Sequence, residues 1–198
     1  GEGTATRMLP SGEFLGRPRV SIALAATRGW QLAGESAPAG MGSGQNQRAQ
    51  IKMSPDEVTA FLAERRPMGM STLNADGTIH SVAMWYGFLD GDLAIETKAK
   101  SQKAVNLSRN PTCTLLVEDG DAYEELRGVE LVCEAELVTD PDQVWSVGVS
   151  VYSRYMGPYD DSLRPYVEVM LNKRNIYRFK VLRTVSWDHR KISRAVAG

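Results

Sequence analysis

The sequence predicts a mainly β protein in which antiparallel strands close into a barrel, with a few helices between them. Apolar segments follow one another across short turns such as Asn74-Ala75-Asp76-Gly77 and Asp90-Gly91-Asp92, which are typical of hairpins. Strands and helices do not alternate regularly, so a doubly wound parallel sheet is not expected. Closure into a barrel removes the exposed edges that an antiparallel sheet otherwise presents.

Each predicted element rests on a local signal. Ser54-Pro55-Asp56-Glu57 combines a capping box with a proline in the first turn, and the helix that it starts is expected to end near Arg66, before Pro67. Asp140-Pro141-Asp142 caps a longer helix, and Gly157-Pro158 breaks it. Alternating apolar and polar positions predict the strands. The expected helices are residues 54–66, 101–109 and 141–156, and the expected strands are residues 68–73, 79–89, 93–97, 112–117, 126–138, 167–171 and 176–182.

Composition and charge are those of an ordinary globular protein. The chain has 198 residues, of which 42% are hydrophobic and 24% charged, and its formal net charge is -1. This balance excludes the basic field of a nucleic-acid-binding protein, and no apolar run approaches the roughly 20 residues of a membrane-spanning helix. The two cysteines, Cys113 and Cys133, are too few for a zinc cluster. We expect buried thiols in a reducing cytoplasm and no metal site.

The first 52 residues differ in composition from the rest and hold 9 of the 18 glycines. Their one apolar run, residues 20–26, lies too far from the start for a signal peptide. We expect a poorly ordered N-terminal extension over residues 1–52, with a regulatory or transit-like tail as the alternative, and a folded domain over residues 53–198.

A segment rich in lysines and hydroxyl groups joins one predicted strand to the short helix that Ser101 opens. It runs Thr97-Lys98-Ala99-Lys100-Ser101-Gln102-Lys103. Free N–H groups at a helix start, together with lysines and hydroxyls, bind phosphate. Lys98 and Lys100 share one face of an extended strand, and Lys103 falls in the first helical turn. The segment predicts a phosphate site for a nucleotide-like cofactor, and hence an enzyme; a solvated lysine face is the alternative.

The order of elements and three motifs resemble the split-barrel flavin family typified by pyridoxamine 5′-phosphate oxidase. The resemblance covers residues 53–191 and is greatest to the actinobacterial branch that uses the deazaflavin coenzyme F420. It implies a six-stranded antiparallel split β-barrel of the FMN-binding type, and a homodimer with two cofactor sites at its interface. The motifs are Leu73-Asn74-Ala75-Asp76-Gly77-Thr78-Ile79-His80, Lys98-Ala99-Lys100-Ser101-Gln102-Lys103 and Val185-Ser186-Trp187-Asp188-His189-Arg190-Lys191.

The resemblance also implies which residues hold the cofactor. The lysine-rich segment would bind its phosphate and, for F420, the γ-linked glutamates that follow. The strand from residue 81 to 86 would run beneath the ring system, with core packing as the alternative for its side chains. Trp187 would close the barrel or touch the cofactor edge. The expected cofactor-binding residues are Lys98, Lys100, Ser101, Gln102, Lys103, Met84, Trp85 and Trp187.

The catalytic residues are unknown from the sequence, apart from one candidate. Arg154, Tyr155 and Tyr159 would line the substrate side of the groove or form a surface cluster, and Tyr155 is a candidate proton donor. Lys173 and Arg174 lie in a turn from which a partner subunit could reach the cofactor tail, although a solvated turn is the preferred interpretation. No carboxylate–histidine–nucleophile pattern is present, so hydrolysis is not expected.

The resulting prediction is a cytoplasmic oxidoreductase that passes a hydride from reduced F420 to an electron-poor organic acceptor. The cofactor carries this chemistry, so no essential nucleophile is expected. An FMN-dependent oxidase or reductase is the alternative in the same fold; we find no second basic clamp for the substrate phosphate of a pyridoxamine-phosphate oxidase. A non-catalytic barrel that binds haem through His80 or His189 is the alternative of another class. The expected partners are a second copy of the chain and a small-molecule acceptor, with neither nucleic acid nor membrane.

Overall fold

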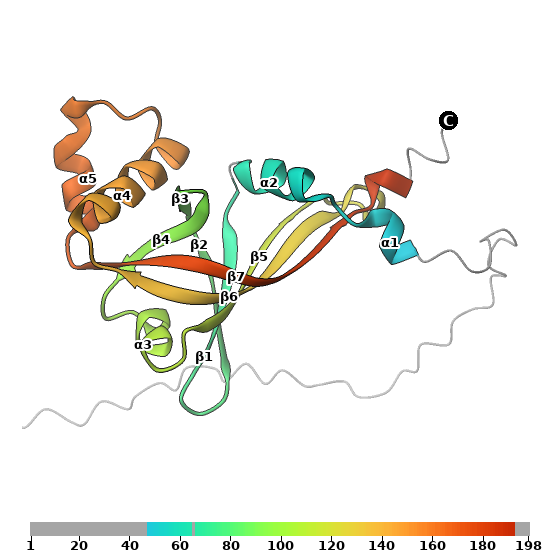
Figure 1. Ribbon diagram of the computed structural model, residues 1–198, viewed down its shortest axis with the longest axis horizontal. Helices are drawn as coiled ribbons and strands as arrows, with labels where there is room; N and C mark the ends of the chain where they lie inside the picture. The colour runs from blue at the N-terminus through green and yellow to red at the C-terminus, as the bar shows by residue number, and fades with distance from the viewer. Residues whose placement is uncertain (1–46, 65, 193–198) are drawn as a thin grey trace, which may run out of the picture. The chain divides into compact units, whose positions relative to one another are not determined.

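The computed structural model describes residues 47–64 and 66–192 (Figure 1). Within them, one antiparallel sheet has the strand order β2-β1-β5-β6-β7-β4-β3. Its strands are β1 (Met68–Leu73), β2 (Ile79–Met84), β3 (Gly87–Leu89), β4 (Asp92–Lys98), β5 (Thr112–Asp119), β6 (Arg127–Val138) and β7 (Arg174–Asp188). The helices are α1 (Gln47–Ile51), α2 (Pro55–Ala63), α3 (Gln102–Arg109), α4 (Pro141–Tyr155) and α5 (Arg164–Leu171), with short 3-10 turns at Tyr123–Glu125 and Asp161–Leu163.

The sheet curls until its two edge strands meet. β2 and β3 lie at opposite ends of the strand order, yet only Trp85 and Tyr86 separate them along the chain. The chain from the last residue of β2 to the first of β3 reaches at most about 11 Å, whereas a flat sheet would hold these edges roughly 30 Å apart. The mainly β split-barrel prediction is therefore confirmed, with seven strands in place of six.

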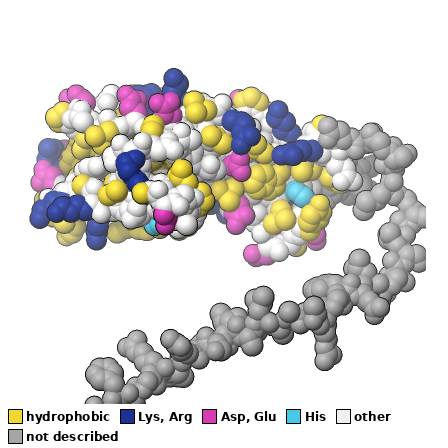
Figure 2. Space-filling model, turned by 90° about the horizontal axis from the view of Figure 1, so that it is seen from below, with side chains coloured by type: hydrophobic (Ala, Val, Ile, Leu, Met, Phe, Trp, Pro, Cys, Tyr) yellow, Lys and Arg dark blue, Asp and Glu magenta, His cyan; other side chains and the backbone are white. Residues whose placement is uncertain are grey.

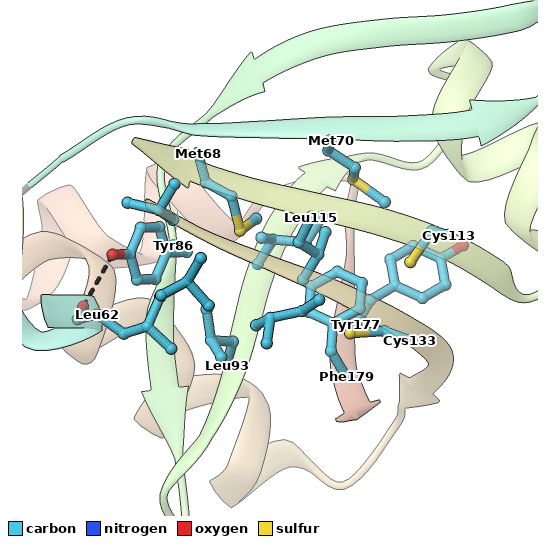
Figure 3. Packing of buried hydrophobic residues seen from close by; sticks show 14 of the residues in the cluster. Leu62, Met68, Met70, Tyr86, Leu93, Cys113, Leu115, Cys133, Tyr177 and Phe179 are labelled. Carbon is cyan, nitrogen blue, oxygen red and sulfur yellow. Dashed lines mark hydrogen bonds between the residues drawn. The ribbon is translucent and has the colours of Figure 1, made fainter. Parts of the chain in front are cut away.

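The interior of the curl is filled by every second residue of the strands. In β1 the buried positions are Met68, Met70 and Thr72, and the positions between them are more exposed. Figure 3 shows Met68, Met70 and Leu115 packed together, with the Tyr86 hydroxyl donating a hydrogen bond to the Leu62 carbonyl oxygen at 2.8 Å. This bond satisfies the one polar atom of a large buried ring, so Tyr86 can fill the core at the corner where the barrel closes.

The predicted helix starts are confirmed by their caps. Ser54 and Glu57 exchange the two hydrogen bonds of a capping box, and Asp140 accepts hydrogen bonds from two N–H groups at the start of α4. α1 lies within the predicted N-terminal extension and packs beside β7, while residues 1–46 of that extension lie outside the described residues.

Three predicted strands differ from the structure. The expected strand over residues 176–182 is longer than predicted, since β7 runs over Arg174–Asp188. The expected strand over residues 79–89 is divided into β2 and β3, because the chain turns the corner of the barrel at Trp85 and Tyr86. The expected strand over residues 167–171 is wrong, since these residues belong to α5. Pro165 fits the first turn of this helix. Val167 is buried while Val169 is 76% exposed. Residues two positions apart point to different sides of a helix, so only one of the two valines reaches the core.

The described surface carries no single dominant charge on the face that Figure 2 shows. There, Lys and Arg side chains lie at separate places among acidic and hydrophobic ones. Among the described helices, none is both long enough and apolar enough to cross a membrane.

Candidate functional site

A hollow of about 530 Å³ opens beside the corner where β2 ends, a size within the usual range for ligand sites. One part of its wall is apolar, from the end of β2 and from α5, and the other part is charged. Its lining residues are Pro67, Ala83, Met84, Trp85, Glu96, Met170 and Arg174. Flat apolar wall and local charge together suit a ligand that has both a ring system and anionic groups.

Trp85 is held as a flat wall by a second ring. Its indole stacks on the Tyr155 ring with 4.7 Å between centroids and 4° between planes, yet the residue remains 46% exposed. The Tyr155 hydroxyl donates to the Arg66 carbonyl oxygen at 2.8 Å and accepts a long bond from the Tyr86 N–H at 3.4 Å. Tyr155 therefore positions Trp85. The role of Tyr155 as a proton donor stays a prediction, which requires its bond to Arg66 to break.

Arg154 anchors this end of α4 to the last turn of α2. Its guanidinium donates to the carbonyl oxygens of Leu62 at 2.8 Å and Ala63 at 2.9 Å, and also to that of Glu64. It donates to the Tyr86 hydroxyl at 3.0 Å as well. The end of a helix leaves such carbonyls without partners. Arg154 supplies donors for them and so fixes the end of α4, which carries Tyr155, against α2. Tyr159, by contrast, packs edge-to-face with Trp145 at 6.0 Å, away from this contact.

The lysine-rich segment joins β4 to α3, as predicted. Lys98 and Lys100 do not share a strand face as expected, because β4 ends at Lys98 and Lys100 lies in the turn that follows. Ser101 caps α3, its hydroxyl accepting the Ala104 N–H at 3.4 Å. The turn is tied to the start of β7, because the Ala99 N–H donates to the Lys173 carbonyl oxygen at 3.1 Å. Lys98 and Lys100 are exposed, whereas Lys103 is half-buried. Gln102 bonds Asn106 on the next helical turn at 2.9 Å.

Glu96 was not identified from the sequence, and Arg174 was named there only as a residue that a partner subunit could supply. Glu96 and Arg174 form an ion pair at 2.8 Å. Burial, reinforced by the charge of Arg174, lowers the pKa of Lys103, while Glu96 acts against this shift. Burial also raises the pKa of Glu96, against the effect of Arg174 and Lys103. The pairing of Lys98 with Arg174 across β4 and β7 assembles this group within one chain, and only a known strand pairing could have revealed it.

The remaining predicted residues lie elsewhere. Trp187 is near the far end of β7, about 40 Å along the strand from Arg174, and its ring lies over Gly128, where an added Cβ would be 2.3 Å from a ring carbon. Its cofactor contact stays a prediction that a second subunit would have to fulfil. His80 lies on β2, and His189 packs edge-to-face on Tyr123 with 4.5 Å between ring centroids. Neither histidine lines the hollow.

Comparisons with known proteins place the chain in a family and support its fold. The family model of pyridoxamine 5′-phosphate oxidase matches residues 54–188, and the chain belongs to this family. The F420H(2)-dependent biliverdin reductase of Mycobacterium tuberculosis (strain CDC 1551 / Oshkosh) is 32% identical over 121 residues, which cover 60% of this chain and 84% of the reductase.

Two solved structures are similar to this chain in sequence and fold. The conserved hypothetical protein Rv2991 from Mycobacterium tuberculosis is 49% identical with a TM-score of 0.72, over 75% of this chain and 93% of that protein. A structure of an F420 reductase is 25% identical with a TM-score of 0.50, over 63% of this chain and 93% of its own. The family resemblance that the sequence motifs indicated is thus confirmed.

Proposed function

We propose that this protein is an F420H2-dependent reductase that delivers a hydride from the reduced deazaflavin to an electron-poor organic acceptor. The observation that carries the proposal is the hollow at the barrel corner, where the exposed indole of Trp85 faces a site that also contains Arg174. Relatives named for F420-dependent reduction support the choice of cofactor. The acceptor itself is a small molecule whose identity the proposal leaves open.

The residues present fit such a cofactor. A flat ring system requires a flat apolar wall, which the Trp85–Tyr155 stack provides together with Met84 and Met170. Anionic groups beyond the ring require cations, and Lys98 and Lys100 are exposed beside the capped start of α3. Charge-assisted hydrogen bonds from such lysines contribute roughly 1.5–3 kcal/mol each.

When bound, reduced F420 supplies the hydride. The protein's part is to bind, orient and shield it. Met84 and Trp85 pack against the ring, while Lys98, Lys100 and Lys103 hold the phosphate and the anionic tail, and the apolar wall keeps water away. The Tyr155 hydroxyl already donates to Arg66, which favours solvent as the source of the product's proton.

An FMN-dependent oxidase or reductase is the second candidate. The specific observation in its favour is the family match itself, which is to pyridoxamine 5′-phosphate oxidase. A haem-binding role has less support, because neither His80 nor His189 lines the hollow. We further propose a homodimer in which the partner subunit completes each site.

The deciding experiment is a pair of titrations of the purified chain, one with F420 and one with FMN, followed by fluorescence quenching. Tight binding of F420 alone supports the reductase and justifies a screen of electron-poor acceptors with reduced F420. Tight binding of FMN alone contradicts the F420 proposal and supports an FMN-dependent oxidase or reductase. Binding of neither contradicts the proposal, since the lysine segment would then be a solvated surface.

A further inference from the structure

The charged part of the hollow contains an acid where an anionic ligand is expected to bind. Glu96 comes from β4 and Arg174 is the first residue of β7, and both line the hollow. Lys103 lies on α3 outside this lining, and its charge acts on Glu96. The Glu96 side chain is only 11% exposed and the Arg174 side chain 29% exposed. A carboxylate so enclosed beside two cations occupies the positive charge that an anionic ligand would otherwise use.

The ion pair between Arg174 and Glu96 is close. Arg174 Nη1 lies 2.8 Å from Glu96 Oε2, and this buried oxygen has no further hydrogen-bond partner among the described residues. Burial raises the pKa of Glu96, and the charged groups that oppose this shift are Arg174 from β7 and Lys103 from α3. Glu96 is therefore protonated more readily than a solvated carboxyl group.

A phosphate that reaches Arg174 and Lys103 would lie within a few ångströms of Glu96. Two negative groups that share one site cannot both stay ionised without strong repulsion, so a proton is taken up by the weaker acid. Phosphate remains an anion at neutral pH, and Glu96 is the group with the raised pKa. Protonation of Glu96 would also free Arg174 to bind the ligand.

We propose that Glu96 sets the affinity of this site for phosphate-bearing ligands: its carboxylate pairs with Arg174 in the ligand-free protein, and a phosphate displaces it with the uptake of one proton. The inference rests on the proposed function for its natural ligand, F420. It makes Glu96 a specificity-determining residue that disfavours weakly charged ligands and ties cofactor binding to pH.

The direction of the pH effect follows from the proton balance. The bound ligand raises the pKa of Glu96 further, so the affinity for F420 is highest at a pH below the pKa that Glu96 has in the ligand-free protein. As pH rises above that value, the affinity falls by up to about tenfold per pH unit. The fall ends once pH exceeds the pKa that Glu96 has in the complex. Substituting Glu96 with glutamine removes this slope and tightens binding at high pH, because a neutral amide competes for no cation.

The experiment compares the unmodified chain with Glu96→Gln and with Glu118→Gln, an exposed glutamate on β5. F420 is titrated from pH 6 to pH 9. We expect Glu96→Gln to bind F420 about tenfold more tightly than the unmodified chain at pH 8 and to show a flatter pH profile, with Glu118→Gln unchanged. Equal profiles for all three proteins would overturn the inference, since ligand ionisation is common to them.

Calorimetry supplies a second readout that does not depend on affinity. Heats of F420 binding at pH 8, measured in two buffers of different ionisation enthalpy, give the number of protons taken up. We expect uptake approaching one proton per site in the unmodified chain and its loss in Glu96→Gln. Uptake that persists in Glu96→Gln assigns the proton to another group, such as Lys103, and overturns the inference.

Inorganic pyrophosphate separates this inference from the proposed function. If F420 fails to bind but pyrophosphate binds more tightly to Glu96→Gln than to the unmodified chain, the reductase proposal fails while the role of Glu96 stands. If F420 binds and no difference between the variants is seen with either ligand, the reductase proposal stands and the role of Glu96 fails. If neither ligand binds any of the proteins, both fail.

Discussion

Lys103 differs from the other lysines of its segment in its surroundings. Lys98 and Lys100 are exposed, whereas Lys103 is half-buried and its pKa is lowered by burial and by the charge of Arg174. A half-buried lysine beside another cation gains more binding free energy from an anionic ligand than a fully solvated lysine does. Of the three lysines, it should therefore contribute most to cofactor affinity.

Replacing Lys103 with alanine is expected to weaken F420 binding by about 10- to 100-fold, the loss of one charge-assisted hydrogen bond. Single-turnover hydride transfer at saturating F420 should change little, because the lysine binds a group remote from the ring. Fluorescence titration and stopped-flow absorbance measure the two effects. Arg164→Ala, which removes a 59% exposed cation at the start of α5, is the control. Unchanged affinity in Lys103→Ala would remove this residue from the binding site.

The sequence indicated the lysine-rich segment as a candidate phosphate site, but it did not indicate that Glu96 and Arg174 would pair beside it. A strand that runs into lysines and a serine-capped helix is a local signal, readable without the fold. Glu96 and Arg174 are 78 positions apart, and only the antiparallel pairing of β4 with β7 places them together. For Trp85, the sequence indicated an aromatic wall but could not indicate that Tyr155 would stack on it.

The two cysteines lie opposite each other on neighbouring strands. Cys113 pairs with Cys133 in the β5–β6 register, and both are buried free thiols. Burial raises the pKa of Cys113 to about 12, with Cys133 adding to the shift, and burial raises the pKa of Cys133 to about 11. Neither thiol forms an appreciable amount of the reactive thiolate at neutral pH.

A thiol-specific reagent at pH 8 should accordingly react with neither cysteine in the native protein and with both in denaturant. The chain has two cysteines in all, so the denatured protein supplies its own calibration. Absorbance of the released chromophore measures the titre. Fast reaction of one thiol in the native state would show that the β5–β6 part of the core opens readily.

Among the elements, α4 depends on Arg154 for its attachment to α2. The same guanidinium lies 4.4 Å from the centre of the Tyr86 ring, so one side chain links α4, the end of α2 and the barrel corner. Removing it leaves carbonyl oxygens at the end of α2 without their donors and opens space beside a buried ring.

We expect Arg154→Ala to lower the free energy of unfolding by about 2–4 kcal/mol. Arg154→Lys should recover part of the loss, because an ammonium cannot reach several carbonyls with the fixed fork of a guanidinium. Lys100→Ala is the control, because Lys100 is an exposed cation of the turn after β4 and its removal should change stability by less than about 0.5 kcal/mol. Denaturant unfolding gives the values, and an Arg154→Ala protein as stable as the control would contradict the anchoring role.

Elements with end signals were predicted more accurately than elements defined by apolar spacing alone. The serine and aspartate caps located the starts of α2, α3 and α4. Residues 167–171 carried no such cap, and the valines at alternate positions favoured a strand. In the structure α5 packs on α4, where an added Cβ at Gly148 would lie 2.7 Å from a methyl carbon of Leu171. Gly148 lets α5 pack closely on α4. This tertiary contact cannot be predicted from the local spacing of apolar residues.

At the scale of the whole molecule, the middle of β7 is uncovered. β4 pairs with β7 only as far as Arg178, and residues 180–184 are all exposed. The β6–β7 register shifts there, so that Val181 pairs with Cys133 and Arg183 with Val132, leaving Leu182 as the extra residue of a β-bulge. Val181 and Leu182 are 40% and 55% exposed. Bulges redirect side chains outward, and here they expose two adjacent apolar side chains.

This bulge is where we expect the second subunit of the proposed homodimer to pack. Val181 also lines an apolar hollow of about 460 Å³ that extends to Val58 and Leu62 of α2. An exposed apolar surface of this kind marks an interaction site. Light scattering should therefore give twice the chain mass of 21.8 kDa.

Leu182→Glu places a charge in this surface and should shift the mass to that of the monomer, since an unpaired charge is costly to bury in an interface. If the partner subunit completes the site, F420 affinity should fall with it, by about tenfold or more at concentrations where the unmodified chain is dimeric. Leu137→Glu, at a leucine that is 51% exposed on β6, controls for the charge itself. A monomeric unmodified chain that binds F420 fully would show that one subunit suffices, whereas a dimer that survives Leu182→Glu would place the interface elsewhere.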